Sequence, residues 1–211
     1  MRRVQTLALL AALDVAGCAH PPPDVAPLLT VATDSCATSP TLGSAVPTAA
    51  TIDGDTEKPA TAMLDEHSPC LATSDGKALY TVFALPDGGP YTIRVASVPQ
   101  GSSILAPRAI GLDAAGQVVR ELPVTSFMFR GNNFVALYRS HDGERYLLVR
   151  SDVPTAGQPL ARIQESIQQT VASTGYATFI IYTGSDLPMN TTWALNGKIL
   201  VSVVADKPPK N

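Results

Sequence analysis

The sequence predicts an all-β protein, an antiparallel β-sandwich of the jelly-roll or immunoglobulin-like kind with one short amphipathic helix. Short runs rich in β-branched, aliphatic and aromatic residues recur at roughly ten-residue intervals, which is typical of a sandwich. Turn residues separate these runs. The 211 residues include 18 prolines and 15 glycines but only 16% charged residues, and this composition disfavours a helical bundle.

Composition also excludes some classes of protein. With 45% hydrophobic residues and few charges, the chain is not expected to be disordered throughout. Its formal net charge of −3 gives no basic excess, so nucleic acid is not an expected partner.

The central strands follow from apolar runs bounded by turn residues. They are predicted at Ala78–Leu85, Tyr91–Val95, Ile104–Leu112, Gln117–Leu122, Phe127–Arg130, Phe134–Arg139 and Arg145–Arg150. The turn at 86–90 predicts a hairpin between the first two strands, and Ser140-His141-Asp142-Gly143 predicts a tight hairpin between the last two. Pro107 indicates an edge position or a bulge.

The C-terminal part contains the predicted helix. Leu160, Ile163, Ile167 and Val171 recur at helical spacing with polar residues between them, and Gly175 would end the helix. A strand is then expected at Tyr176–Thr183.

Asn196-Gly197 predicts a last hairpin, between strands at Thr191–Leu195 and Lys198–Val204. The sandwich is therefore expected to span residues 63–205, and residues 206–211 form a polar tail that is expected to fray.

The first residues are typical of a secretory signal. Arg2 and Arg3 precede the apolar run Thr6–Leu13, which is too short to span a bilayer. Val15-Ala16-Gly17-Cys18 is similar to a bacterial lipobox, in which small residues admit the peptidase and the thiol accepts the lipid. We expect residues 1–17 to be removed and Cys18 to be lipidated. The alternative is a plain signal peptide that contains a cysteine.

Residues 18–62 are rich in Pro, Ala and Thr, which predicts a tether that is semi-rigid near its prolines. The acidic cluster Asp53–Glu57 lacks the further ligands of a calcium loop, so a solvated turn is expected there and no metal site.

The remaining cysteines, Cys36 and Cys70, form an even pair once Cys18 carries lipid. In an oxidising compartment such a pair predicts one disulfide. The alternative is two unrelated buried thiols. No histidine lies at ligand spacing, so zinc is not expected.

Several motifs occur in one order: Gly89-Pro90-Tyr91-Thr92-Ile93-Arg94, Ala106-Pro107-Arg108, Leu112-Asp113 and Glu144-Arg145-Tyr146-Leu147-Leu148-Val149. Together they resemble the maltose-operon periplasmic protein (MalM-like) family, many of whose members are bacterial lipoproteins. Pro69, the strand at Tyr80–Pro86 and Asn196–Ile199 fit the same pattern. The resemblance covers residues 63–152 and, more weakly, the C-terminal hairpin, and the chain departs from it between Ala161 and Asp186.

The resemblance implies an extracytoplasmic accessory role linked to maltose and maltodextrin uptake. It supplies no catalytic residues. Ala19 follows the lipobox cysteine where an inner-membrane lipoprotein would carry Asp, so by resemblance to Gram-negative lipoproteins we expect sorting to the outer membrane.

Catalytic patterns are not found. Ser140, His141 and Asp142 are adjacent in one turn and cannot point at each other as a triad. Asp113 and Glu144 flank turns, so solvated charges are expected rather than a carboxylate pair. We therefore expect no enzyme and no cofactor.

Sugar binding would require aromatic platforms. Trp193, Tyr176 and Tyr182 are hypothesised to form one exposed patch for a ligand or partner, and the alternative is that they pack in the core.

The sequence as a whole predicts a non-catalytic lipoprotein on the periplasmic side of the outer membrane. Its expected partners are the membrane, through the lipid, and an envelope protein or an oligosaccharide. Two other functions remain open: a structural subunit of an envelope or secretion complex, and a glycan-active hydrolase.

Overall fold

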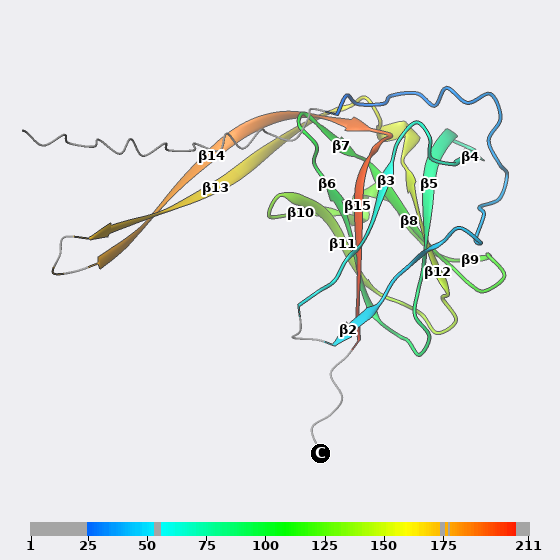
Figure 1. Cartoon of the computed structure of the whole chain (residues 1–211). Coiled ribbons are helices and arrows are strands. Elements are labelled where there is room, and N and C mark those ends of the chain that lie inside the picture. Colours follow the sequence, from blue (N-terminus) through cyan, green and yellow to red (C-terminus); the bar gives the residue numbers. More distant parts are fainter. Residues whose placement is uncertain (1–24, 53–55, 174–175, 177, 206–211) are drawn as a thin grey trace, which may run out of the picture.

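Two six-stranded sheets face each other in the computed structural model of the chain (Figure 1). The structure describes residues 25–52, 56–173, 176 and 178–205. The first sheet has the order β1 (Val46–Pro47), β5 (Gly76–Ala84), β12 (Tyr146–Ser151), β8 (Pro107–Leu112) and β9 (Val118–Leu122), and β4 (Cys70–Thr73) also pairs with β5. The second has the order β10 (Met128–Arg130), β11 (Asn133–Arg139), β6 (Thr92–Val98), β15 (Gly197–Ala205) and β2 (Ala50–Ile52), and β3 (Ala60–Leu64) also pairs with β15.

A third sheet consists of β13 (Pro159–Ser173), β14 (Thr178–Ala194) and the short β7 (Ser103–Leu105). The first two of these strands form a long ribbon that projects from one end of the sandwich (Figure 1). The expected all-β sandwich is confirmed. Its sheets are mixed rather than purely antiparallel, because β1, β2 and β7 each pair with a parallel neighbour.

The core lies between the two main sheets. Phe83 of β5 and Leu147 of β12 pack in one cluster with Ile93 of β6 and Ile199 of β15, and all four side chains are buried. Because side chains alternate along a strand, the next residues point to the opposite face of the first sheet.

A second, smaller apolar cluster occupies that opposite face. Tyr80, Val82 and Leu148 form it, and Leu42 and Ala45 pack against it from the N-terminal segment. The segment is therefore bound to the sandwich. The predicted tether over 18–62 is wrong for the described part from residue 25 onward, because β1, β2 and the start of β3 lie within it and pair with β5 and β15.

Two predicted hairpins are wrong. Strands β5 and β6 belong to different main sheets, and so do β11 and β12, so their connections cross between the sheets. The turn residues correctly predicted where the chain reverses. They do not determine which strand the chain pairs with next, since that depends on distant residues. Pro107 begins β8, and the chain leaves the third sheet for the first at Ala106.

Asn196-Gly197 does not join a hairpin either, because β15 pairs with β6, β3 and β2. The Asn196 side chain instead holds the N-terminal segment. Its Oδ1 accepts a hydrogen bond from the Leu28 amide at 2.8 Å, and its Nδ2 donates to the Ala26 carbonyl at 3.0 Å. The backbone at position 197 packs closely against Leu105, so a glycine is required there. A Cβ at this position would lie 2.8 Å from Leu105 Cβ.

The predicted amphipathic helix is wrong, because its residues form strand β13. Positions 163, 167 and 171 differ by four, and a spacing of four returns to the same face of a strand as well as of a helix. The pattern fits both structures, and the residues form a strand here because they pair with β14 over their whole length. Among the described residues the helical pieces are two 3₁₀ turns, Val124–Ser126 and Val153–Thr155, and no helix is long and apolar enough to cross a membrane.

Candidate functional site

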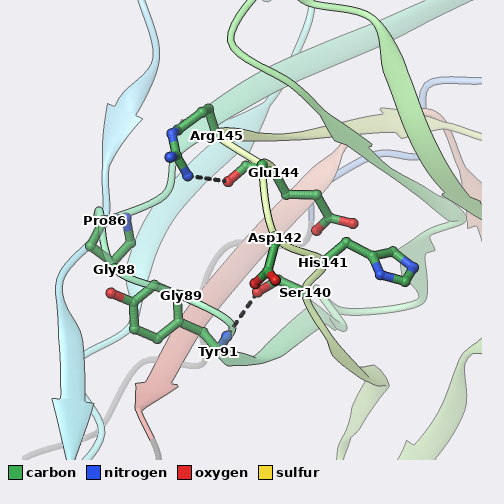
Figure 2. Close-up of a pocket in the computed structure, with 10 residues that line it drawn as sticks. Pro86, Gly88, Gly89, Tyr91, Ser140, His141, Asp142, Glu144 and Arg145 are labelled. Carbon is green, nitrogen blue, oxygen red and sulfur yellow. Dashed lines mark hydrogen bonds between the residues drawn. The ribbon is translucent and has the colours of Figure 1, made fainter.

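A cleft of about 250 Å³ lies where two connections between the sheets meet (Figure 2). The connection from β5 to β6 contributes one wall, and the connection from β11 to β12 contributes the other. The lining residues are Pro86, Gly88, Gly89, Tyr91, Ser140, His141, Asp142, Gly143, Glu144 and Arg145.

Hydrogen bonds fix the two walls to each other. The Tyr91 amide donates to Ser140 Oγ at 2.8 Å, and the Ser140 amide donates to the Tyr91 carbonyl at 2.8 Å. The Tyr91 hydroxyl donates to the Asp87 carbonyl. The Leu85 amide donates to the Arg145 carbonyl at 2.9 Å. Main-chain groups and the Ser140 and Tyr91 hydroxyls therefore hold the cleft and give it a defined shape.

Ser140, His141 and Asp142 do not form a triad. Ser140 is buried, and its hydroxyl accepts the bond from Tyr91, whereas His141 and Asp142 are exposed. Figure 2 shows the His141 ring pointing away from Ser140 and Tyr91. The short turn gives Ser140 a structural role, which agrees with the sequence-based interpretation of this segment as a hydrogen-bonded turn.

Glu144 differs from the solvated charge that the sequence predicts, because its side chain has no solvent exposure. Among the described residues neither carboxylate oxygen has a hydrogen-bond partner. The Arg120 Nε atom lies 3.6 Å from Glu144 Oε1. Burial raises the pKa of the Glu144 carboxyl, against the opposing effects of the His141 amide, of Arg120 and of the His141 ring.

Tyr138 completes this buried cluster. The Arg120 guanidinium lies 5.2 Å from the centre of the Tyr138 ring, in the range of a cation–π contact. The Tyr138 hydroxyl is buried and, among the described residues, without a hydrogen-bond partner. Burial, together with the nearby Glu144 carboxylate, raises the pKa of the hydroxyl. Burial therefore disfavours the charged form of both the Tyr138 hydroxyl and the Glu144 carboxyl.

Asp113 serves a different purpose. Its Oδ1 accepts bonds from the Ala115 and Gln117 amides, both at 2.8 Å, and so closes the turn between β8 and β9. With Asp113 engaged in a turn and Glu144 enclosed, neither carboxylate is presented to a substrate as a glycosidase pair would be.

A second group of charges lies on the outer face of the first sheet. Arg108 Nη1 contacts Glu121 Oε1 at 2.8 Å, and Arg108 Nε contacts Asp152 Oδ1 at 2.9 Å. The buried Arg150 guanidinium lies 3.9 Å from Asp75 and from Glu121. Burial and the neighbouring Arg108 lower the pKa of Arg150. The network was not predicted from the sequence.

The predicted disulfide between Cys36 and Cys70 is confirmed. Cys18 lies outside the described residues. In the part of the chain that the structure describes, no three His, Cys, Asp or Glu side chains gather as metal ligands would.

The three aromatic residues of the hypothesised patch are not brought together. Trp193 is buried at the base of the ribbon, with its ring edge-on to Phe134 at 4.9 Å, as the core alternative predicted. Tyr176 lies at the far end of the ribbon and is fully exposed. Tyr182 lies on β14 opposite Gln169. The patch is therefore wrong as a single surface.

Comparison of the chain with known protein families, with curated protein sequences and with solved structures finds no match.

Proposed function

We propose that the protein is a lipid-anchored, non-catalytic lipoprotein of the outer membrane, facing the periplasm, and that its sandwich acts as an accessory binding or scaffolding unit. The observation that carries the proposal is the pairing of Cys36 with Cys70. Because the chain has three cysteines, this pairing leaves Cys18, at the end of the lipobox-like motif, as the one cysteine outside the bridge.

The disulfide also supports an extracytoplasmic location, because disulfides persist in oxidising compartments and are rare in the cytosol. It joins the N-terminal segment to β4, at the end of the first sheet. A lipid at Cys18 would thus be connected to a segment that is covalently held on the sandwich.

Support for binding rather than catalysis comes from the cleft. Its serine is engaged by the Tyr91 amide, and its buried carboxyl group, Glu144, is enclosed against Arg120. The polar side chains left exposed around it, His141, Asp142 and the partly exposed Arg145, are ones that bind polar ligands through hydrogen bonds.

The proposed link to carbohydrate uptake rests on the resemblance to the MalM-like family. The cleft is where sugar hydroxyls would bind, through Asp142 and Arg145. Titration of the protein with maltodextrins, followed by calorimetry, tests this part. A heat of binding that is measured with the wild type and is lost in Asp142→Ala would support sugar binding in the cleft. The absence of any heat of binding with the wild type at millimolar sugar would contradict it.

The anchoring part is tested by fractionation of the cell envelope. The wild type is expected in the outer membrane, whereas Cys18→Ala is expected to lose its membrane attachment. Recovery of the wild type from the soluble periplasm would contradict the proposal. Cross-linking of the outer-membrane fraction then identifies the partner, and a secretion subunit recovered there would favour the structural-subunit alternative.

A further inference from the structure

The ribbon of β13 and β14, here called the arm, is paired over its whole length but has little further support. Fifteen residues of β13 oppose β14 in one continuous register. Only Thr192, Trp193 and Ala194 of β14 also pair with β7. Beyond this base the described residues form a two-stranded ribbon that projects from the sandwich (Figure 1). An isolated two-stranded ribbon is at best marginally stable in water.

The far end of the arm exposes large apolar side chains. Val171, Phe179 and Ile180 are 61%, 54% and 52% exposed, and Tyr176 at the turn is fully exposed. Val171 and Ile180 are direct cross-strand neighbours, so they form one continuous apolar surface. Exposed apolar surface of this kind marks an interaction site.

Charge is absent from the same part of the sequence. Residues 166–185 contain no Asp, Glu, Lys, Arg or His. Soluble proteins normally protect exposed strand edges with charged residues, particularly lysine. The end of the arm has no such protection, and it therefore carries no charge that would have to lose its hydration on entering an apolar layer.

The base of the arm lies beside the first described residue of the chain. Ser103 of β7 pairs with Thr192 of β14, and Ser103 Oγ donates to the Val25 carbonyl at 3.1 Å. Seven residue-to-residue steps lead from Cys18 to Val25 in the sequence. At about 3.5 Å per residue they span at most about 25 Å.

A lipid at Cys18 would therefore hold the base of the arm within about 25 Å of the membrane surface. The 17 residues of β14 extend over roughly 55 Å at 3.3 Å per residue, so the arm is longer than this gap. Its far end can reach the surface that holds the anchor.

We propose that the end of the arm, formed by Val171, Tyr176, Phe179 and Ile180, lies in the interfacial layer of the membrane that holds the lipid anchor. The inference rests on the proposed lipidation of Cys18. Tyrosine favours the level of the lipid headgroups, and the aliphatic and phenyl groups favour the adjoining acyl region. Two attachments, a lipid and an arm, would fix the orientation of the sandwich on the membrane.

The test places a fluorescent reporter at the end of the arm. In the lipidated full chain, Tyr176→Cys provides a single free thiol, because Cys36 and Cys70 are joined and Cys18 is acylated. The thiol is labelled with the environment-sensitive dye NBD, and the protein is reconstituted into vesicles of phosphatidylethanolamine and phosphatidylglycerol. We expect a blue-shifted emission and quenching by spin-labelled lipids. The control is Asp87→Cys, whose native side chain is 95% exposed on a connection at the other end of the sandwich, and its label should keep the emission seen in water.

A matched pair of variants tests the apolar contact. In the Tyr176→Cys chain, Phe179→Ser with Ile180→Ser should reduce lipid quenching at least severalfold. Val118→Ser removes a similarly exposed apolar side chain from β9, at 64% exposure, and should leave the quenching unchanged. Thermal unfolding of both variants checks that the sandwich is intact.

Each result is decisive for one of the two proposals. A chain that floats with the vesicles while its Tyr176→Cys label stays water-like overturns the arm inference and leaves the anchor intact. A chain that does not float contradicts the anchor, and the arm inference fails with it. The third outcome concerns the non-lipidated chain, Cys18→Ser with the NBD label on Tyr176→Cys, measured without vesicles. A blue shift of its emission that grows with protein concentration would mean that a second copy covers the arm, and this also overturns the inference.

Discussion

Gly111 and Glu144 share one space: a Cβ at position 111 would lie 2.8 Å from the Glu144 carboxyl carbon. Gly111 lies on β8, beside Leu147 of β12 and Arg120 of β9. The absence of a side chain there lets the Glu144 carboxyl enter the interior and meet Arg120. The glycine and the buried acid are therefore one structural feature, which lies beside the cleft.

Gly111→Ala is expected to lower the free energy of unfolding by about 1–3 kcal/mol, because the added methyl group forces the carboxyl group or the strand to move. Chemical denaturation measures the change. Gly43→Ala is the matched control, since a Cβ there meets nothing within 4 Å. In a Glu144→Ala background the cost of Gly111→Ala should fall. If Gly111→Ala lowered the free energy of unfolding equally in both backgrounds, the claim that Gly111 and Glu144 compete for one space would be contradicted.

Glu144→Gln should change how stability depends on pH. The raised pKa of Glu144 means that the folded chain binds this proton more tightly than the unfolded chain. Between the ordinary carboxyl value and the raised one, the stability of the wild type therefore falls as pH rises. We expect Glu144→Gln to remove this fall and to be more stable at pH 7, by on the order of 1 kcal/mol, with a smaller gain at pH 4.

Thermal unfolding across this pH range measures the effect, with the exposed Asp142→Asn as control. If Glu144→Gln were less stable than the wild type at pH 7, attraction to Arg120 would outweigh the cost of burying the carboxylate, and this part of the account would be wrong.

Removal of the disulfide by Cys36→Ser with Cys70→Ser is expected to lower the free energy of unfolding. The bridge spans 34 residues, and closing a loop of that length is worth about 3–4 kcal/mol in the chain-entropy treatment. Denaturant unfolding of the wild type with and without a reductant measures the same quantity. An unchanged midpoint on reduction would contradict the role assigned to the bridge.

Asn196→Ala should release the N-terminal segment from the sandwich. The substitution removes the acceptor for the Leu28 amide and the donor to the Ala26 carbonyl, at a net cost of about 1–2 kcal/mol. Hydrogen exchange at the Leu28 amide should become about tenfold faster, or more. Asn196→Asp keeps the acceptor and should give an intermediate rate. Equal rates in all three proteins would show that the segment is held by other contacts.

Local signals in the sequence were sufficient for most strands. Predicted and observed bounds agree to within a few residues for most strands from β5 to β12, because strand periodicity and turn residues are local properties. The exception is the single strand predicted at Ile104–Leu112, which is two strands, β7 and β8, in different sheets. Pairing is not local. The turn at 86–90 predicted a hairpin, yet β5 and β6 enter different sheets. The helix prediction failed because the spacing of Ile163, Ile167 and Val171 fits both helix and strand.

The buried cluster around Glu144 was missed because a charged residue beside a turn is normally solvated. One signal was present: Gly111 lies inside a predicted strand, and such a glycine often marks a bulge or a close approach. Both occur here, since the register shifts at Gly111 and Leu112. The disulfide was predictable because only one pair of cysteines remained after Cys18 was assigned to lipidation.

The central claim, that Cys18 anchors the chain by lipid, is tested most directly by mass spectrometry of the N-terminal peptide from the purified outer membrane. We predict that residues 1–17 are absent and that the peptide begins at Cys18 with the added mass of a diacylglycerol and a fatty acid. A mature chain with an unmodified Cys18, or one cleaved elsewhere and found free in the periplasm, would contradict the account.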